Sequence, residues 1–374
     1  MAGPSLFQRI VLPGLAFKAV VIGGGYATGR ELAQFFLPGG PIGGLLGLGA
    51  TTLLWSIVCV LTFLFARATG SFEYRSFFKA LLGRFWVAFE IVYVALTLLV
   101  VAVFGAAAGE IVHRLGGGPP VVGMLLLGGA IVAVTTYGNR SVERLFKWVS
   151  LLLYGTYALF AVLGFYRFGG QIEAHWQTAP APHDWLQGGL TYGAYNLLGA
   201  VAILPVVRHM RSNRDAIVSG LLCGPLAVIP AVLFFSLMSG FYPEIGQAVL
   251  PSDELLSRLD IPAFRVLFQV MVFMALLEGG TALVHGLNQR LATVMSVGRG
   301  RRLAISAALC LFALFVAARV GLIQLIATGY GASALFIAAV YLVPLLTLGL
   351  KRIVTQKRGQ SDEVHTSSTV FIQE

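Results

Sequence analysis

Long apolar stretches recur along almost the whole chain and are separated by shorter polar segments. A helix needs about 20 predominantly apolar residues to cross the hydrocarbon core of a bilayer, and most of these stretches are long enough. The pattern therefore predicts an all-α integral membrane protein with about ten transmembrane helices. The predicted spans are 10–36, 44–67, 85–112, 120–137, 146–168, 188–207, 214–240, 264–292, 302–318 and 322–350.

Composition supports lipid as the main solvent of the chain. Hydrophobic residues make up 57% of the 374 and charged residues 11%, whereas a soluble domain carries roughly 25% charged residues. We expect one transmembrane domain over residues 1–357 and a disordered polar tail over 358–374. The first apolar stretch has no convincing small-residue cleavage site and is interpreted as a retained span. The three cysteines lie in apolar stretches without metal-ligand spacing, and we expect free thiols.

Positive charge is distributed unevenly between the two sets of loops. With a cytoplasmic N-terminus, 19 of the 26 basic residues fall on inner segments and five on outer ones. Cytoplasmic loops are enriched in Lys and Arg, so both termini are predicted to lie on the cytoplasmic side of the plasma (inner) membrane. The net charge of +10 is then a topology signal, and no nucleic acid or protein partner is predicted.

Two inter-span segments are longer than simple connectors. Residues 68–84 mix aromatic, apolar and basic side chains, which favours a short amphipathic helix on the inner membrane face. Residues 241–263 carry four carboxylates around apolar positions. We interpret them as an outer lid or gate loop, with an ordinary ordered loop as the alternative.

Two of the spans are predicted to be interrupted. Ten spans divide into five plus five, with repeats over about 8–168 and 186–350, and an odd number per half implies an inverted repeat. Glycines crowd both the first span, at 23–29, and the sixth, at 188–199, which also contains Pro205. Gly/Pro-interrupted segments at corresponding positions indicate a transporter binding site. Close helix packing around glycine is the alternative reading.

Unwound backbone within a membrane has polar groups that are tolerated only where they line a cavity or find partners. A half-helix beginning near Thr28 would offer amide groups and a positive dipole end to an anionic group of a solute. Tyrosine and asparagine side chains flank the two interruptions, although packing is the commoner role of membrane aromatics. The candidate substrate-binding residues are Gly23, Gly24, Gly25, Tyr26, Thr28, Arg30, Tyr192, Tyr195 and Asn196.

The run from Ile22 to Glu31, IGGGYATGRE, followed by Phe35 and Phe36, resembles the first-helix signature of YkvI-type membrane proteins. These belong to the amino acid–polyamine–organocation superfamily. The resemblance implies a LeuT-type fold, with five-plus-five inverted repeats and discontinuous helices 1 and 6. It also implies a sodium site against the first-span interruption, for which Thr281 supplies the hydroxyl and Ile22 lies nearby. The chain departs from the signature at Gly24 and Arg30, where the family has alanine and glutamine.

Three side chains are candidates for ion or proton coupling: Glu278, Thr281 and Lys18. A carboxylate at the centre of a span costs roughly 2.5–3.5 kcal/mol and should face the bundle interior. Glu278 is therefore expected to bind a proton or cation, or to form a structural ion pair with Lys18 or Arg30. Lys18 either takes the place of a bound cation or extends to the inner surface.

Arg30 has three interpretations from sequence. Its guanidinium would clamp a substrate carboxylate, form an outer gate, or make a structural pair with Glu110 or with another span. Tyr93 and Thr97 in the third span are weaker candidates for the site.

The sequence as a whole predicts a secondary active transporter. The expected cargo is a small polar organic solute, such as an amino acid or a related zwitterion or amine, moved by alternating access with Na⁺ or H⁺ as the coupling ion and no other cofactor. A membrane sensor on the same scaffold is the alternative. No GxSxG, HExxH or Walker motif occurs in the sequence, so an enzyme is not expected.

Overall fold

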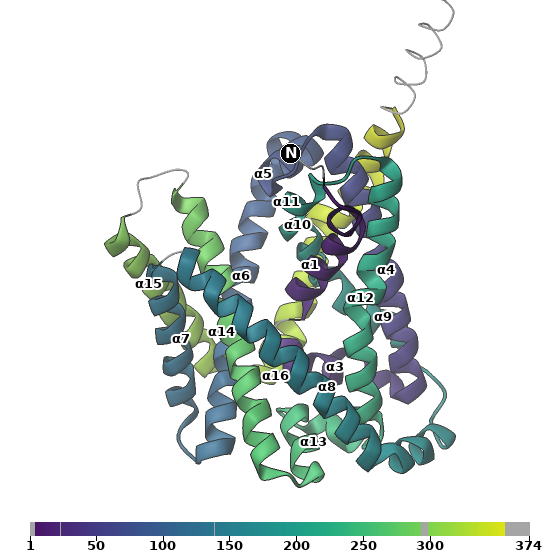
Figure 1. The fold of residues 1–374 in the computed structure, drawn as a ribbon, viewed down its shortest axis with the longest axis vertical. Coiled ribbons are helices and arrows are strands. Elements are labelled where there is room, and N and C mark those ends of the chain that lie inside the picture. Colours follow the sequence, from purple (N-terminus) through teal and green to yellow (C-terminus); the bar gives the residue numbers. More distant parts are fainter. Residues whose placement is uncertain (1–3, 23, 138, 293–297, 356–374) are drawn as a thin grey trace, which may run out of the picture.

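The computed structural model describes residues 4–22, 24–137, 139–292 and 298–355. These residues form helices and connecting segments, without strands, arranged as an elongated bundle (Figure 1). The first half contains α1 (Leu12–Val21), α2 (Gly24–Ala27), α3 (Arg30–Phe35), α4 (Gly40–Thr69), α5 (Tyr74–Leu82), α6 (Trp86–Gly116), α7 (Pro120–Tyr137) and α8 (Asn139–Gln177).

The second half begins with short helices and continues with long ones. Its final stretch, Leu322–Thr355, is helical throughout and mixes α with wider turns. The elements are α9 (Trp185–Tyr195), α10 (Leu198–Ala202), α11 (Leu204–Val207), α12 (Asn213–Ser239), η4 (Glu244–Gln247), α13 (Pro251–Leu259), α14 (Pro262–Ala292), α15 (Arg299–Val320), α16 (Leu322–Gln324), η5 (Leu325–Tyr330) and α17 (Gly331–Ile337).

Six helical stretches in the described part of the chain are long and apolar enough to cross a membrane. The multi-pass character predicted from sequence is therefore confirmed. The other four predicted spans fall on the interrupted helices α1–α3 and α9–α11, on the shorter α7 and on α8. The ten-span, five-plus-five arrangement stays a prediction, and the predicted tail 358–374 lies outside the described residues. The six stretches are Leu37–Thr69, Tyr74–Gly116, Asn213–Ser239, Pro262–Asn288, Arg299–Val320 and Leu322–Thr355.

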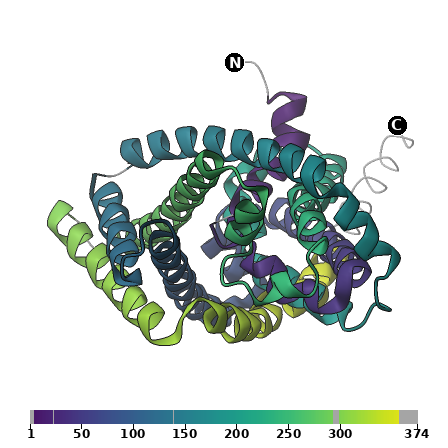
Figure 2. The same cartoon turned by 90° about the horizontal axis from the view of Figure 1, so that it is seen from below.

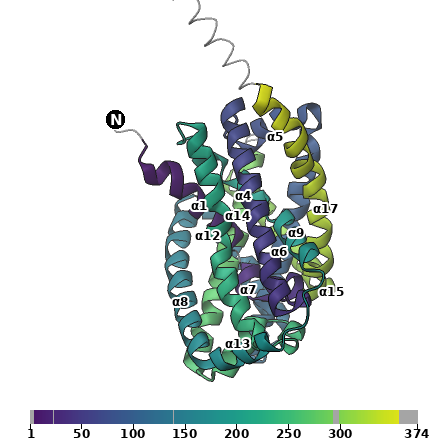
Figure 3. The ribbon, with the colours of Figure 1, turned by 90° about the vertical axis from the view of Figure 1, so that its right-hand side faces the viewer.

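The two ends of the bundle carry different short elements. The N-terminal residues and α5 lie at one end, and α13 lies at the other (Figure 3). Helix α8 runs along one edge of the bundle (Figure 2), where it packs on α12 and α14. The amphipathic helix expected within 68–84 corresponds to α5, which buries Phe77, Phe78 and Leu81.

Residues 241–263 do not form the loop that the sequence suggested. They contain η4 and the nine-residue helix α13, whose Leu255 and Leu256 are buried. Local signals for this helix are present, because Pro251 occupies its first turn and is followed by Asp253 and Glu254, all favourable at a helix start. Residues 241–263 therefore form a packed helical segment, and their role as a lid stays a prediction.

Close packing of α4 on α12 depends on glycine. A Cβ added to Gly220 of α12 would lie 2.6 Å from the backbone nitrogen of Val60 on α4. One turn further along α12, Gly224 approaches the carbonyl oxygen of Thr52. Small residues spaced by four positions allow two membrane helices to approach at backbone distance. This contact holds the first half of the chain against the second.

Gly220→Ala is expected to force α4 and α12 apart and to lower the melting temperature by several degrees, because overpacking costs about 1–3 kcal/mol. Gly49→Ala, on α4 of the same helix pair, is the matched control. A Cβ added to Gly49 would have no neighbouring atom within 4 Å. Thermal unfolding of both purified variants tests the expectation. Equal melting temperatures would contradict it.

Candidate substrate-binding site

The first helical run of the chain is interrupted twice within a few residues. Helix α1 ends at Val21, and Ile22 has a non-helical ψ of 70°. Between α2 and α3, Gly29 adopts a left-handed φ of 76°, which glycine tolerates and other residues rarely adopt. Its Cβ would also lie 2.8 Å from the Phe234 ring. Gly24 and Gly25 belong to the short α2, whereas Gly23 lies outside the described residues.

A second interruption occurs between α9 and α10, at Asn196 and Leu197. The side-chain amide of Asn196 donates to the carbonyl oxygen of Tyr192 at 3.0 Å. This bond satisfies a carbonyl near the end of α9 and keeps the asparagine side chain beside the interruption.

A cavity of about 300 Å³ lies between the two interruptions. Its walls come from α1, α3, α6, α10 and α14, the α9–α10 interruption and the end of η5. This volume is at the small end of the range for sites that bind organic ligands. Most of the lining is aliphatic, and its polar members are Glu31, Tyr93, Thr97, Tyr195, Asn196, Glu278 and Tyr330.

Several sequence candidates line this cavity and several do not. Tyr195, Asn196 and Glu278 line it, as does Ile22. The remaining candidates that have side chains do not line the cavity: Lys18, Tyr26, Thr28, Arg30, Tyr192 and Thr281. Tyr26 and Tyr192 are 1% and 0% exposed, and Tyr192 packs among Phe35, Phe36 and Trp55, which is a packing role.

The contacts of Arg30 fit a role in an outer gate better than the binding of a substrate carboxylate. Its Nη1 donates to the carbonyl oxygens of Gly246 and Ala248, at 2.8 and 2.9 Å. Beside it, the backbone amide of Ser252 donates to the carbonyl oxygen of Thr28 at 3.0 Å. The segment before and within α13 is thereby tied across the interruption between α2 and α3.

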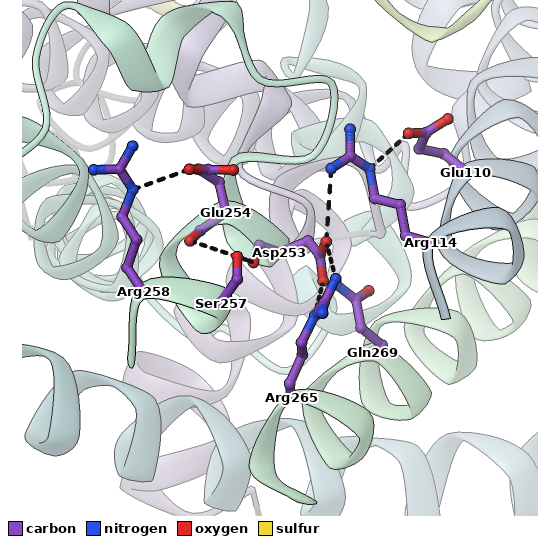
Figure 4. Close-up of polar contacts among 8 residues, drawn as sticks. All are labelled: Glu110, Arg114, Asp253, Glu254, Ser257, Arg258, Arg265 and Gln269. Atoms are coloured by element: carbon purple, nitrogen blue, oxygen red, sulfur yellow. Dashed lines mark hydrogen bonds and ion pairs between the residues drawn. The ribbon is translucent and has the colours of Figure 1, made fainter. Parts of the chain in front are cut away.

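Asp253 fastens α13 to neighbouring helices. Its carboxylate is 1% exposed and receives Nε and Nη2 of Arg265 at 2.8 and 2.7 Å. Gln269 on the same helix, α14, donates to it at 2.8 Å. Arg114 of α6 lies 3.7 Å away and also holds Glu110 (Figure 4). A buried carboxylate with this many donors fixes the position of the segment. The ion pair between Arg30 and Glu110 that the sequence left open does not form, because Glu110 pairs with Arg114.

Glu31, which sequence analysis did not select, is the most buried carboxylate at the cavity. It is 5% exposed, and its Oε2 accepts a hydrogen bond from the Tyr195 hydroxyl at 2.8 Å. Glu278 is half-buried on the opposite helix, α14. In the described part of the chain, neither carboxylate lies within 4.0 Å of a basic side chain, so the predicted pairing of Glu278 with Lys18 or Arg30 does not form.

Lys18 and Thr281 occupy different surroundings. The Lys18 ammonium lies over the Tyr154 ring, 4.2 Å from its centroid. Thr281 is fully buried on α14, which packs against α2, and its hydroxyl has no hydrogen-bond partner in the described structure. An unpartnered buried hydroxyl next to a helix interruption is available as an ion ligand.

The overall fold is of the LeuT type. The fold is shared with MhsT, whose crystal structure is in complex with L-phenylalanine; the TM-score is 0.64 at 15% identity, over 95% of this chain and 98% of that one. A Na⁺-coupled sialic acid symporter in a substrate-bound outward-open state gives a TM-score of 0.47 at 12% identity, covering 93% and 84% of the two chains.

One relative of the chain is YkvI, an uncharacterised membrane protein of Bacillus subtilis (strain 168). The two sequences are 25% identical over 321 residues, which make up 84% of this chain and 90% of YkvI. The resemblance inferred from the first span is therefore confirmed. No family model matches the chain.

Arg30→Gln is expected to loosen the segment over 246–252. Each hydrogen bond to a charged group contributes roughly 1.5–3 kcal/mol, so amide hydrogen exchange there should accelerate about tenfold or more. Arg258→Gln is the control, because Arg258 pairs only with the more exposed Glu244 and Glu254 among the described ion pairs. Unchanged exchange in Arg30→Gln would show that the arginine does not hold this segment.

Proposed function

We propose that this chain is a secondary active transporter that moves a small polar organic solute by alternating access. The observation that carries the proposal is the cavity of about 300 Å³ between the two helix interruptions. A fold that it shares with a protein crystallised with L-phenylalanine supports a cargo of amino-acid size. Both termini would lie on the cytoplasmic side of the plasma membrane, as the loop charges indicate.

In this proposal the interruptions have two roles. The backbone at Ile22, where α1 ends, contacts the solute together with Tyr195 and Asn196, because unwound backbone within a membrane is tolerated where it lines a cavity. The same interruptions act as hinges between half-helices, since few hydrogen bonds oppose bending there. The α13 segment and its ties to Thr28 and Arg30 close one side of the cavity and must release during the cycle.

Two groups are proposed for the coupling ion. Thr281 offers a buried, unpartnered hydroxyl next to α2, and Ile22 lies at the first interruption, so sodium would bind between them. Glu278 faces the cavity without a basic partner in the described structure and is the proposed proton-binding group. Lys18 is a second candidate for proton relay from the inner side.

Ala282→Trp is expected to abolish solute uptake by proteoliposomes while leaving the fold intact, because Ala282 lines the cavity and the indole would fill much of its volume. Leu311→Trp is the control, on an exposed apolar position of α15. Uptake is measured with a panel of radiolabelled amino acids and amines. Equal uptake by both variants would place the transport path elsewhere, and binding without any uptake by the wild type would favour a sensor.

Thr281→Val is expected to weaken stimulation of uptake by sodium at least tenfold in apparent affinity, because it removes the proposed hydroxyl ligand without changing side-chain size. Glu278→Gln tests the proton alternative through the pH profile of uptake at constant sodium. Thr97→Val is the control hydroxyl at the cavity wall. Sodium stimulation that is the same in Thr281→Val and wild type would remove Thr281 from the ion site.

A further inference from the structure

The charges facing the cavity are of one sign. Its only charged lining residues in the described structure are Glu31 and Glu278, which approach from α3 and α14. Arginine, lysine and histidine are absent from that lining. A carboxylate in a partly dehydrated site is stable when an opposite charge offsets the loss of water. The cavity therefore lacks a side-chain cation for either carboxylate.

Basic groups on the surrounding helices are directed to other partners. Arg290 of α14 lies over the rings of Tyr74 and Tyr93, 3.8 and 3.3 Å from their centroids. Arg30 donates to the carbonyl oxygens of Gly246 and Ala248. The Lys18 ammonium lies over the Tyr154 ring. His285, one turn beyond Ala282 on α14, is not a lining residue. These contacts leave the two cavity carboxylates to be neutralised by a bound proton or by a cation that enters the cavity.

Two backbone amides at the start of α3 already donate to partners within the chain. At the start of α3, the Arg30 amide donates to the Thr28 hydroxyl at 3.2 Å. The Gly29 amide donates to the carbonyl oxygen of Tyr26 at 3.0 Å. The sequence had suggested this half-helix end as an anion site, but these two amides face partners within the chain. A carboxylate on the solute would gain little at α3.

Aromatic rings surround the more buried carboxylate. Tyr195, which donates to Glu31, stacks on Tyr330 with ring centroids 4.4 Å apart, and both residues line the cavity. Tyr93 and Phe104 line the wall provided by α6. Aromatic faces attract ammonium groups as well as tolerating apolar carbon. Carboxylate and ring together form a site suited to an organic ammonium.

We propose that the cargo is an organic cation, an amine without a carboxylate, whose ammonium binds Glu31 beside Tyr195 and Tyr330. Glu278, when it has released its proton, supplies a second negative charge at the cavity. This inference rests on the proposed transport function, which it refines by naming the class of solute. It predicts that charge rather than carbon skeleton decides binding.

The test compares solutes that share a skeleton and differ in charge. One set is phenethylamine, phenylalanine and 3-phenylpropionate, and a second is isoamylamine, leucine and 4-methylpentanoate. Each is titrated against purified full-length protein, and thermal stabilisation gives its affinity. We expect each amine to bind at least tenfold more tightly than its amino acid, and neither carboxylate to bind. Tighter binding of the amino acids, or no stabilisation by any amine in either set, would overturn the proposal.

Variants locate the ammonium. Glu31→Gln is expected to weaken amine binding at least tenfold, and Glu173→Gln, an exposed carboxylate on α8, is expected to leave it unchanged. Tyr195→Phe keeps the ring and Glu31 but removes the hydrogen bond, so it provides a second measurement if Glu31→Gln does not fold. A several-fold loss is expected there. Amine binding that is unchanged in the folded variants would refute the assignment.

The transport proposal and the cation proposal fail separately. Uptake of an amino acid that Ala282→Trp abolishes, without amine binding, would keep the transporter and reject the cation. Amine binding that depends on Glu31, without uptake, would keep the cation site and reject transport.

Discussion

The hydrogen-bonding requirement of the backbone inside a membrane governs this structure. An uninterrupted helix meets the requirement by itself, and an interrupted one must find other partners. At the first interruption those partners are within reach: the Ile22 amide donates to Lys18, Gly29 to Tyr26, and the Thr28 carbonyl accepts from Ser252. The last of these bonds comes from a distant part of the chain. The interruption thus recruits α13, and the cavity lies beside it.

Two adjacent residues on α3 have opposite tasks because successive side chains on a helix point in directions about 100° apart. Arg30 faces the α13 segment, and Glu31 faces the cavity. The positively charged Arg30 therefore holds residues 246–248, whereas the negatively charged Glu31 faces the cavity. A shift of one residue in the start of α3 would turn Arg30 toward the cavity and Glu31 away from it, which makes the left-handed turn at Gly29 a determinant of the electrostatics.

The sequence predicted the membrane class, the positions of most helices and the YkvI resemblance. Glycine density pointed to the region of both interruptions, and burial cost correctly placed Glu278 toward the bundle interior. It could not separate Arg30 from Glu31, because neighbours on a short half-helix carry no periodic signal that says which one faces inward. Tyr330 was not identified as a site residue from the sequence, because Tyr195, on which it stacks, is far away along the chain. Helix α13 was missed because its apolar positions are few, although its first turn carried the usual start signals.

Arg30 binds the segment before α13 through the main-chain oxygens of Gly246 and Ala248 and not through side chains of that segment. Main-chain oxygens are the same for every amino acid. The residues of that segment are accordingly free to diverge over evolutionary time while the grip persists, provided the local course of the chain is kept. Relatives that have an arginine at position 30 should therefore vary in the residue types of the segment more readily than in its backbone course.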